Sequence, residues 1–198
     1  MGNIQEWMKR LAKHPDDFAA AIQGMEDTRL AKRPDEKNWA PKEIICHMRD
    51  TEELLFSRFQ NILSIEEPRL PAADAERWAG ERQYIRNDAQ EALAAFRKRR
   101  EETLQFLRGL TPAQLSRVGI HSKYGGMTLE AFVELMVKHG NDHLAQLARA
   151  LSGQPLRTGQ ACKANLFMTV PLPHKNTWTA CSRSLGPSEY EETLGKLF

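Results

Sequence analysis

The chain has 198 residues, and its 28 basic and 26 acidic side chains are interspersed and leave a net charge of +2. This length suits one domain with an appendage, and the balanced charge argues against a polyanion such as nucleic acid as a partner. No apolar stretch reaches the roughly 18 residues that cross a bilayer, no signal peptide is recognisable, and the three cysteines are widely spread, so we expect a cytoplasmic protein without disulfides that does not bind membranes.

The first 40 residues contain a helical pattern that a proline interrupts. Residues 3–13 have apolar side chains at helical spacing, and His14-Pro15 is expected to break or re-angle the helix before it continues to Ile22. His14 is therefore expected at an exposed junction. The charged stretch 26–38 predicts a connection.

A long helix is expected from Pro41 to Ser64. Pro41 suits the first turn, where its missing N–H costs nothing, and the helix would be about 36 Å long. His47 lies beside the inner stripe and turns inward if the helix packs on two sides. The expected inner stripe is Ile44, Met48, Leu55, Phe59 and Ile62.

Three other residues of this helix bear on the chemistry of a site. Asp50, one turn beyond His47, is placed to accept a hydrogen bond from an imidazole and so to set which nitrogen faces inward. Arg58 is placed either to bind an anionic substrate group or to form a surface salt bridge. Cys46 points about 100° away from His47, so we expect a small buried apolar residue rather than a nucleophile.

The middle of the chain predicts a connection and a third long helix. Residues 65–80 contain two prolines and predict a long crossing connection. Apolar residues then keep the helical period over residues 83–108, and Gly109 ends the pattern. The basic run 97–100 is followed at once by two glutamates, which predicts a solvated helix face.

The fourth long helix, residues 128–151, carries two histidines on its apolar stripe. The stretch before it, residues 119–126, predicts a loop with His121 in solvent. His139 and His143 are four residues apart, so their side chains lie one above the other, with Cβ atoms roughly 5 to 6 Å apart. Two inward imidazoles either find separate hydrogen-bond partners or share a metal ion, and the pair alone leaves both readings open.

Four long helical patterns, with a long connection between the second and the third, predict an all-α fold, a four-helix bundle. In such a bundle His47 would meet His139 and His143, and three protein nitrogens with vacant positions are typical of a catalytic metal centre. Imidazole suits Zn, Ni, Cu or Fe, so we expect a divalent metal, Zn or Ni first and Fe or Mn as alternatives. Asp142, next to His143, either supports that ligand or faces solvent.

The last part of the chain differs in character. Residues 156–198 contain three prolines and two of the three cysteines, and no helical or strand period is sustained. The expected division is therefore a bundle domain of residues 1–154 and an irregular C-terminal extension of residues 155–198. That extension is a segment packed on the outside, a partner segment, or a foreign or altered coding end.

Taken together, these features resemble the DinB-like family, with its YfiT-type metal-dependent hydrolases and thiol-dependent transferases. The resemblance covers about residues 3–152. The matching features are Trp39 to Asp50 with His47 inside, Glu52 and Arg58, Phe96 and Arg100, Gly126 to Leu129, and the segment His139-Gly-Asn-Asp-His143-Leu-Ala-Gln146.

The resemblance implies a bundle that holds a divalent metal with His47, His139 and His143 and that often forms homodimers. It also implies a reaction on a small-molecule substrate, either transfer of a low-molecular-weight thiol of the bacillithiol or mycothiol type, or hydrolysis. The alternative is a non-catalytic metal-binding protein of a stress response or an interaction, in which a fourth protein ligand would close the site. The candidate catalytic residues are Asp50, Arg58 and Asp142.

Overall fold

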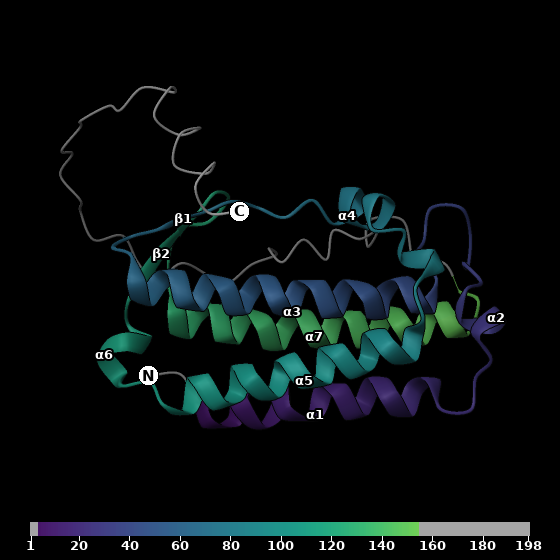
Figure 1. Cartoon of the computed structure of the whole chain (residues 1–198), viewed down its shortest axis with the longest axis horizontal. Helices are drawn as coiled ribbons and strands as arrows, with labels where there is room; N and C mark the ends of the chain where they lie inside the picture. Colours follow the sequence, from purple (N-terminus) through teal and green to yellow (C-terminus); the bar gives the residue numbers. More distant parts are fainter. Residues whose placement is uncertain (1–3, 155–198) are drawn as a thin grey trace. The chain divides into compact units, whose positions relative to one another are not determined.

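The computed structural model describes residues 4–154, and four long helices within them form a bundle (Figure 1). Each long helix packs against two of the others, and the order around the bundle is α1, α5, α3, α7. The prediction of a four-helix bundle is confirmed. The long helices are α1 (Ile4–Ile22), α3 (Pro41–Ser64), α5 (Ala89–Arg108) and α7 (Leu129–Leu151).

The directions of the helices follow from the connections. In Figure 1, α1 and α7 run one way and α3 and α5 run the other, so α3 and α5 are parallel neighbours. Two parallel helices need a connection that returns along the bundle, and residues 65–88 provide it. Short helices occur in the connections: α2 (Asp27–Leu30), α4 (Ala75–Glu81), a 3₁₀ turn (Tyr84–Arg86) and α6 (Pro112–Leu115).

The ends of the long helices are set by local hydrogen bonds. Pro41 is the first residue of α3, and the Glu43 carboxylate accepts the Ala40 N–H at 2.8 Å. Thr128 Oγ1 accepts the Ala131 N–H at 3.1 Å and starts α7. Asp88 does the same for α5, which therefore begins at Ala89, later than the expected residue 83.

The expected break at Pro15 is absent, because α1 continues through it. A proline inside a helix leaves the carbonyl four residues earlier without its N–H donor. That carbonyl belongs to Leu11, and Arg100 Nη1 of α5 donates to it at 2.8 Å. A neighbouring helix thus supplies the missing donor, and His14 lies inside the bundle with 0% of its surface exposed, not at an exposed junction.

The expected loop at residues 119–126 is a β-hairpin. Strand β2 (Val118–His121) pairs antiparallel with β3 (Gly125–Thr128), and the crossing connection adds β1 (Arg69–Leu70), parallel to β2. Gly119 permits this close packing, since a Cβ there would lie 2.7 Å from Leu70 Cδ1. The sheet lies beside the C-terminal end of α3 (Figure 1).

Two apolar clusters fill the bundle, and a layer of buried polar residues separates them. One cluster includes Phe18, Ile44, Phe96 and Leu147. The other includes Leu11, Phe59, Leu104 and Phe132. Between these positions each long helix contributes polar side chains to one level: His14 from α1, His47, Thr51 and Glu52 from α3, Arg100 and Thr103 from α5, and His139 and His143 from α7.

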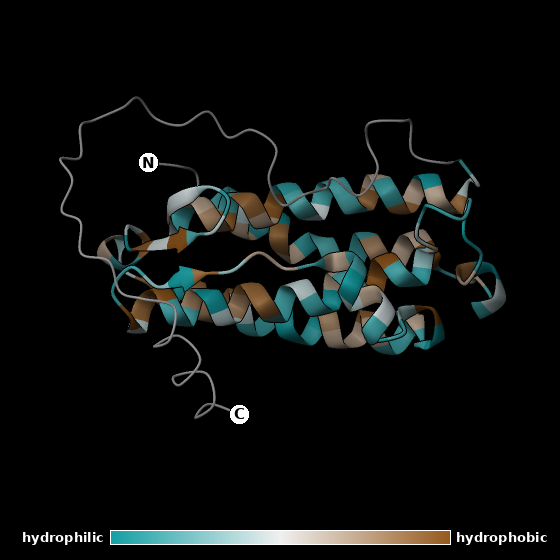
Figure 2. Ribbon diagram, turned by 90° about the horizontal axis from the view of Figure 1, so that it is seen from above, coloured by the Kyte–Doolittle hydropathy of each residue, from teal (hydrophilic) through white to brown (hydrophobic). Residues whose placement is uncertain are grey.

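Coloured by hydropathy, the helices carry hydrophobic and hydrophilic residues in alternating patches (Figure 2), as expected for amphipathic helices with one buried stripe. The expected stripe of α3 is confirmed, because all five of its residues are buried. Among the described residues, no helix is long and apolar enough to cross a membrane.

Candidate metal centre

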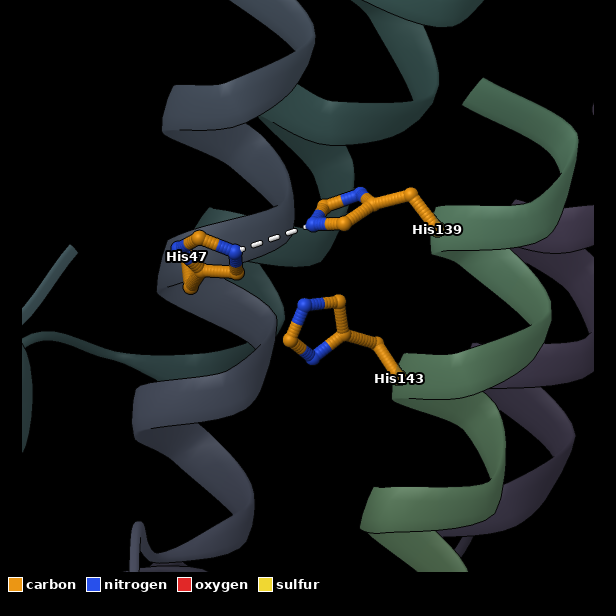
Figure 3. Close-up of side chains that lie close together, drawn as sticks. All are labelled: His47, His139 and His143. Carbon is orange, nitrogen blue, oxygen red and sulfur yellow. Dashed lines mark hydrogen bonds between the residues drawn. The ribbon is translucent and has the colours of Figure 1, made fainter. Parts of the chain in front are cut away.

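The three histidines predicted to be metal ligands meet inside the bundle. His47 of α3 faces His139 and His143, which project from consecutive turns of α7 (Figure 3). His47 Nε2 lies 3.2 Å from His139 Nε2, and one nitrogen of each ring lies within 4.8 Å of the others. All three side chains are buried, with His143 0% exposed. The structure therefore brings the three nitrogens to one point.

The arrangement fits a shared cation. Bonds of about 2.0 to 2.1 Å to one tetrahedral ion place two nitrogens roughly 3.3 Å apart, close to the separation of His47 and His139. His143 Nδ1 lies 2.7 Å from Gln146 Oε1, which can only accept, so Nδ1 carries the proton. Nε2 of His143 then presents a lone pair, and it has no hydrogen-bond partner among the described residues. A buried acceptor without a donor is what a metal ligand requires.

The imidazoles are held neutral, which is the form that binds a metal. Burial lowers the pKa of His47 well below 6.5, and the neighbouring His143 lowers it further. The pKa of His139 is lowered by burial and by both other histidines. Burial also lowers the pKa of His143 to about 4, although its hydrogen bond to Gln146 acts in the opposite direction.

No fourth histidine, cysteine, aspartate or glutamate of residues 4–154 joins the three ligands. Cys46, the neighbour of His47 in sequence, points elsewhere, with its Sγ 3.8 Å from the Tyr84 carbonyl oxygen. Burial raises the pKa of its thiol to about 11. Cys46 is thus a buried, protonated side chain, as expected, and is not a nucleophile.

The expectation that Asp50 orients His47 is wrong. Both Asp50 oxygens are occupied by other donors, with Arg49 Nε at 2.6 Å, Arg82 Nη1 at 2.6 Å and the Tyr84 hydroxyl at 2.7 Å. These contacts fasten the crossing connection to α3. The polar neighbour of His47 is instead Thr51, whose Oγ1 lies 3.3 Å from Nε2.

Asp142 and Arg58 lie apart from the three ligands. Asp142 is 45% exposed and pairs with Lys138 at 3.0 Å on the outer face of α7, so the solvent-facing alternative is the correct one. Arg58 is 11 residues beyond His47, about 16 Å along α3. It is only 3% exposed and forms no ion pair with a described residue, so it is not part of a surface salt bridge.

A second polar cluster was missed by the sequence analysis. Arg100 was assigned to a solvated face, but it is 1% exposed and donates to both oxygens of Glu52, at 2.9 and 2.6 Å. His14 joins this cluster, 3.3 Å from Arg100 Nη1 and 3.1 Å from Asn141 Oδ1. The spacing contained a signal, since Arg100 follows Phe96 by four residues on the buried stripe of α5.

His121 was also misplaced, because it was expected in solvent and is 0% exposed on β2. Its Nδ1 accepts the Lys123 N–H at 3.1 Å, which closes the turn between β2 and β3. Burial is the largest cause that lowers its pKa to about 4. The hairpin that buries this ring consists of four-residue strands, too short to be recognised by their periodicity.

The bundle and its buried histidine triad define a class of four-helix proteins with an internal site between facing helices. The sequence profile of the DinB superfamily matches residues 10–147, and the chain belongs to this family.

Individual relatives agree with this assignment. The chain is 25% identical over 154 residues to "Putative metal-dependent hydrolase OB0413" of Oceanobacillus iheyensis, covering 76% of this chain and 86% of that protein. It is 24% identical over 143 residues to "Putative metal-dependent hydrolase YfiT" of Bacillus subtilis, covering 72% and 80%. The solved structure of YfiT, described as a probable metal-dependent hydrolase with an unusual four-helix bundle topology, matches with a TM-score of 0.71 at 22% identity, covering 78% of this chain and 91% of YfiT.

Proposed function

We propose that the chain is a divalent-metal-dependent enzyme whose three-histidine centre activates a small nucleophile. The nucleophile is either a low-molecular-weight thiol, for transfer to an electrophile, or water, for hydrolysis. The observation that carries this proposal is the triad of neutral, buried imidazoles with no fourth ligand among residues 4–154. A structural metal site is normally closed by four protein ligands, whereas a catalytic one keeps a position for the reactant.

The chain's own residues prepare this centre. Gln146 holds the proton on Nδ1 of His143 and leaves Nε2 available. The Trp39 ring lies against the His47 ring, with centroids 5.0 Å apart, and together with the buried surroundings it limits the access of bulk water. A divalent ion bound here would lower the pKa of a coordinated water to about 7 or deprotonate a coordinated thiol. The relatives whose names describe metal-dependent hydrolases support the same class of chemistry.

Metal content tests the site. The protein is treated with a chelator, reloaded with Zn²⁺ or Ni²⁺, desalted and measured by elemental analysis. We expect roughly one ion per chain in the wild type and a large loss in His143→Ala, because two of three ligands hold an ion poorly. The matched control is Lys138→Ala, an exposed residue of the same helix, which should bind metal like the wild type. Equal metal in wild type and His143→Ala would disprove the site.

Turnover tests the enzyme. The metal-loaded protein is incubated with a panel of small thiols and a model electrophile, and separately with activated ester and amide substrates without thiol. Transfer that requires both thiol and metal would establish a thiol transferase, and thiol-independent cleavage would establish a hydrolase. Stoichiometric metal without either reaction would favour the non-catalytic alternative.

A further inference from the structure

Arg58 is a buried cation that forms no ion pair within the described part of the chain. Arg58 is 3% exposed, and within residues 4–154 its hydrogen-bond partner is the Pro71 carbonyl oxygen, which lies 2.5 Å from Nη2. Nε and Nη1, which together carry three of the five N–H donors of a guanidinium, have no hydrogen-bond partner among the described residues. Burial lowers the pKa of Arg58 to about 10, which leaves it charged at neutral pH. A buried charge without a partner is costly, so its presence calls for an explanation.

The other fully buried arginine shows what a structural role looks like in this bundle. Arg100 forms two hydrogen bonds to Glu52 and donates a further one to the Leu11 carbonyl oxygen. Its charge and its donors are therefore satisfied within the protein. Arg58 is similarly buried, but among the described residues it has one hydrogen bond and no carboxylate partner, so its charge is not paired there.

The sheet that Arg58 contacts also carries His121. Pro71, which accepts its hydrogen bond, follows β1, and the next strand of the sheet presents His121. Burial is the largest cause that lowers the pKa of His121, and the charges of Arg58 and Lys123 also lower it. Because Nδ1 of His121 accepts the Lys123 N–H, the proton of the neutral ring is on Nε2.

The location is close to the surface and in line with the metal centre. Pro71, whose carbonyl oxygen accepts the hydrogen bond from Arg58, is exposed, and so are residues 72–74 after it. Arg58 follows His47 by 11 positions, which turn α3 by about 1100°, so the two side chains leave the helix within roughly 20° of each other, about 16 Å apart along the axis.

We infer that Arg58, with His121 beside it, binds an oxyanion, a carboxylate or phosphate group of a small molecule. Guanidinium binds both groups through charge-assisted hydrogen bonds, which would use the Arg58 donors that have no acceptor among residues 4–154. The anion site follows from Arg58 alone. Its assignment to the substrate rests on the proposed function, with the anionic end at Arg58 and the reacting end towards the three histidines.

The test uses the full chain after treatment with a chelator, so that no anion can bind through a metal. Thermal unfolding is measured in sodium chloride, sodium acetate and sodium phosphate at equal ionic strength, for the wild type and for Arg58→Met. We expect acetate or phosphate to raise the Tm of the wild type above its value in chloride. These salts also stabilise folded proteins in general, so the rise should be clearly smaller in Arg58→Met than in the wild type. The Tm of Arg58→Met in chloride should be at least that of the wild type, because an unpaired buried charge has been removed.

The two anions distinguish the source of the group: a rise with acetate alone indicates a carboxylate, and a rise with phosphate alone a phosphate. Arg117→Met is the matched control, an arginine at the same end of the bundle whose donors are used by the Ile62 and Ile65 carbonyl oxygens, and it should keep the wild-type response. If Arg58→Met does not fold, Arg58→Gln serves in its place, with the same expected loss of response.

Two results would overturn the inference. One is a wild type that responds to neither anion. The other is an equal response of wild type and Arg58→Met, which would assign the anions to another site, such as the cavity of about 540 Å³ lined by Arg29, Lys32 and Arg33. Metal content separates this test from that of the proposed function, because Arg58→Met keeps all three histidines and should bind metal like the wild type.

Discussion

The buried polar layer contains two clusters that differ in how far the protein satisfies them. In the first, Glu52, Arg100, His14 and Asn141 come from all four long helices, and their charges and hydrogen bonds are met by one another. In the second, the three histidines converge, and no fourth ligand joins them among residues 4–154. Within the same residues, Nε2 of His143 has no hydrogen-bond partner.

The difference separates scaffold from site. A buried polar group that has all its partners specifies how the helices pack, whereas one that lacks a partner is costly unless something else binds it. The first cluster should therefore respond to mutation through stability. The second should respond through what the protein binds, and the variants below test this distinction.

The largest effect is expected from Glu52→Gln. The change leaves the Arg100 charge buried without its carboxylate, and breaking a buried ion pair on one side costs about 3 to 5 kcal/mol. The free energy of unfolding would be measured by urea titration with a chelator present. The matched control is Glu53→Gln, whose side chain is 68% exposed and 3.9 Å from Arg99, and its effect should stay below about 1 kcal/mol. Equal losses in the two variants would contradict the scaffold role of the first cluster.

A pH-dependent effect is expected from His14. Its pKa is lowered from 6.5 to about 4, chiefly by burial and also by the charges of Arg100 and Arg10, while Asn141 and Asp17 act in the opposite direction. The unfolded chain therefore binds a proton in the range where the folded chain does not. The stability contributed by neutral His14 is complete above about pH 6.5 and is lost as the pH falls towards 4, by up to about 1.4 kcal/mol per pH unit.

Comparison with His14→Gln isolates this contribution from that of the other histidines. Urea titrations of both metal-free proteins between pH 7 and pH 4 should show the wild type losing about 3 kcal/mol more than the variant. Parallel curves would mean that the pKa of His14 is not lowered by folding.

The sequence predicts the scaffold well where the evidence is local. The helical period of apolar residues predicted the bundle, and the bounds of α3 and α7 were recognised because Pro41 and Thr128 mark helix starts. The histidine triad was also accessible, since His139 and His143 occupy core positions of an amphipathic helix and His47 lies beside another core stripe.

What escaped prediction depends on partners distant in the chain. Pro15 does not end α1 because Arg100, 85 positions later, donates to the Leu11 carbonyl oxygen, and no local rule can show that donor. Asp50 was assigned to His47 on helical spacing, but the Tyr84 and Arg82 side chains of the crossing connection reach it instead. Long-range contacts thus decided which polar residues belong to the scaffold.

The smallest effect is expected from Asp142→Asn, although Asp142 is the immediate neighbour of a predicted ligand. Its carboxylate lies on the outer face of α7 and pairs with Lys138, and an exposed pair four residues apart on a helix contributes about 0.3 to 0.5 kcal/mol. The variant should therefore unfold within that margin of the wild type and bind the same amount of metal. A clear loss of metal, measured by elemental analysis beside His143→Ala, would mean that the exposed face of α7 contributes to the site. Neighbours in sequence are not neighbours in space here, because α7 turns by about 100° per residue, which directs the His143 side chain to the other ligands and the Asp142 side chain to solvent.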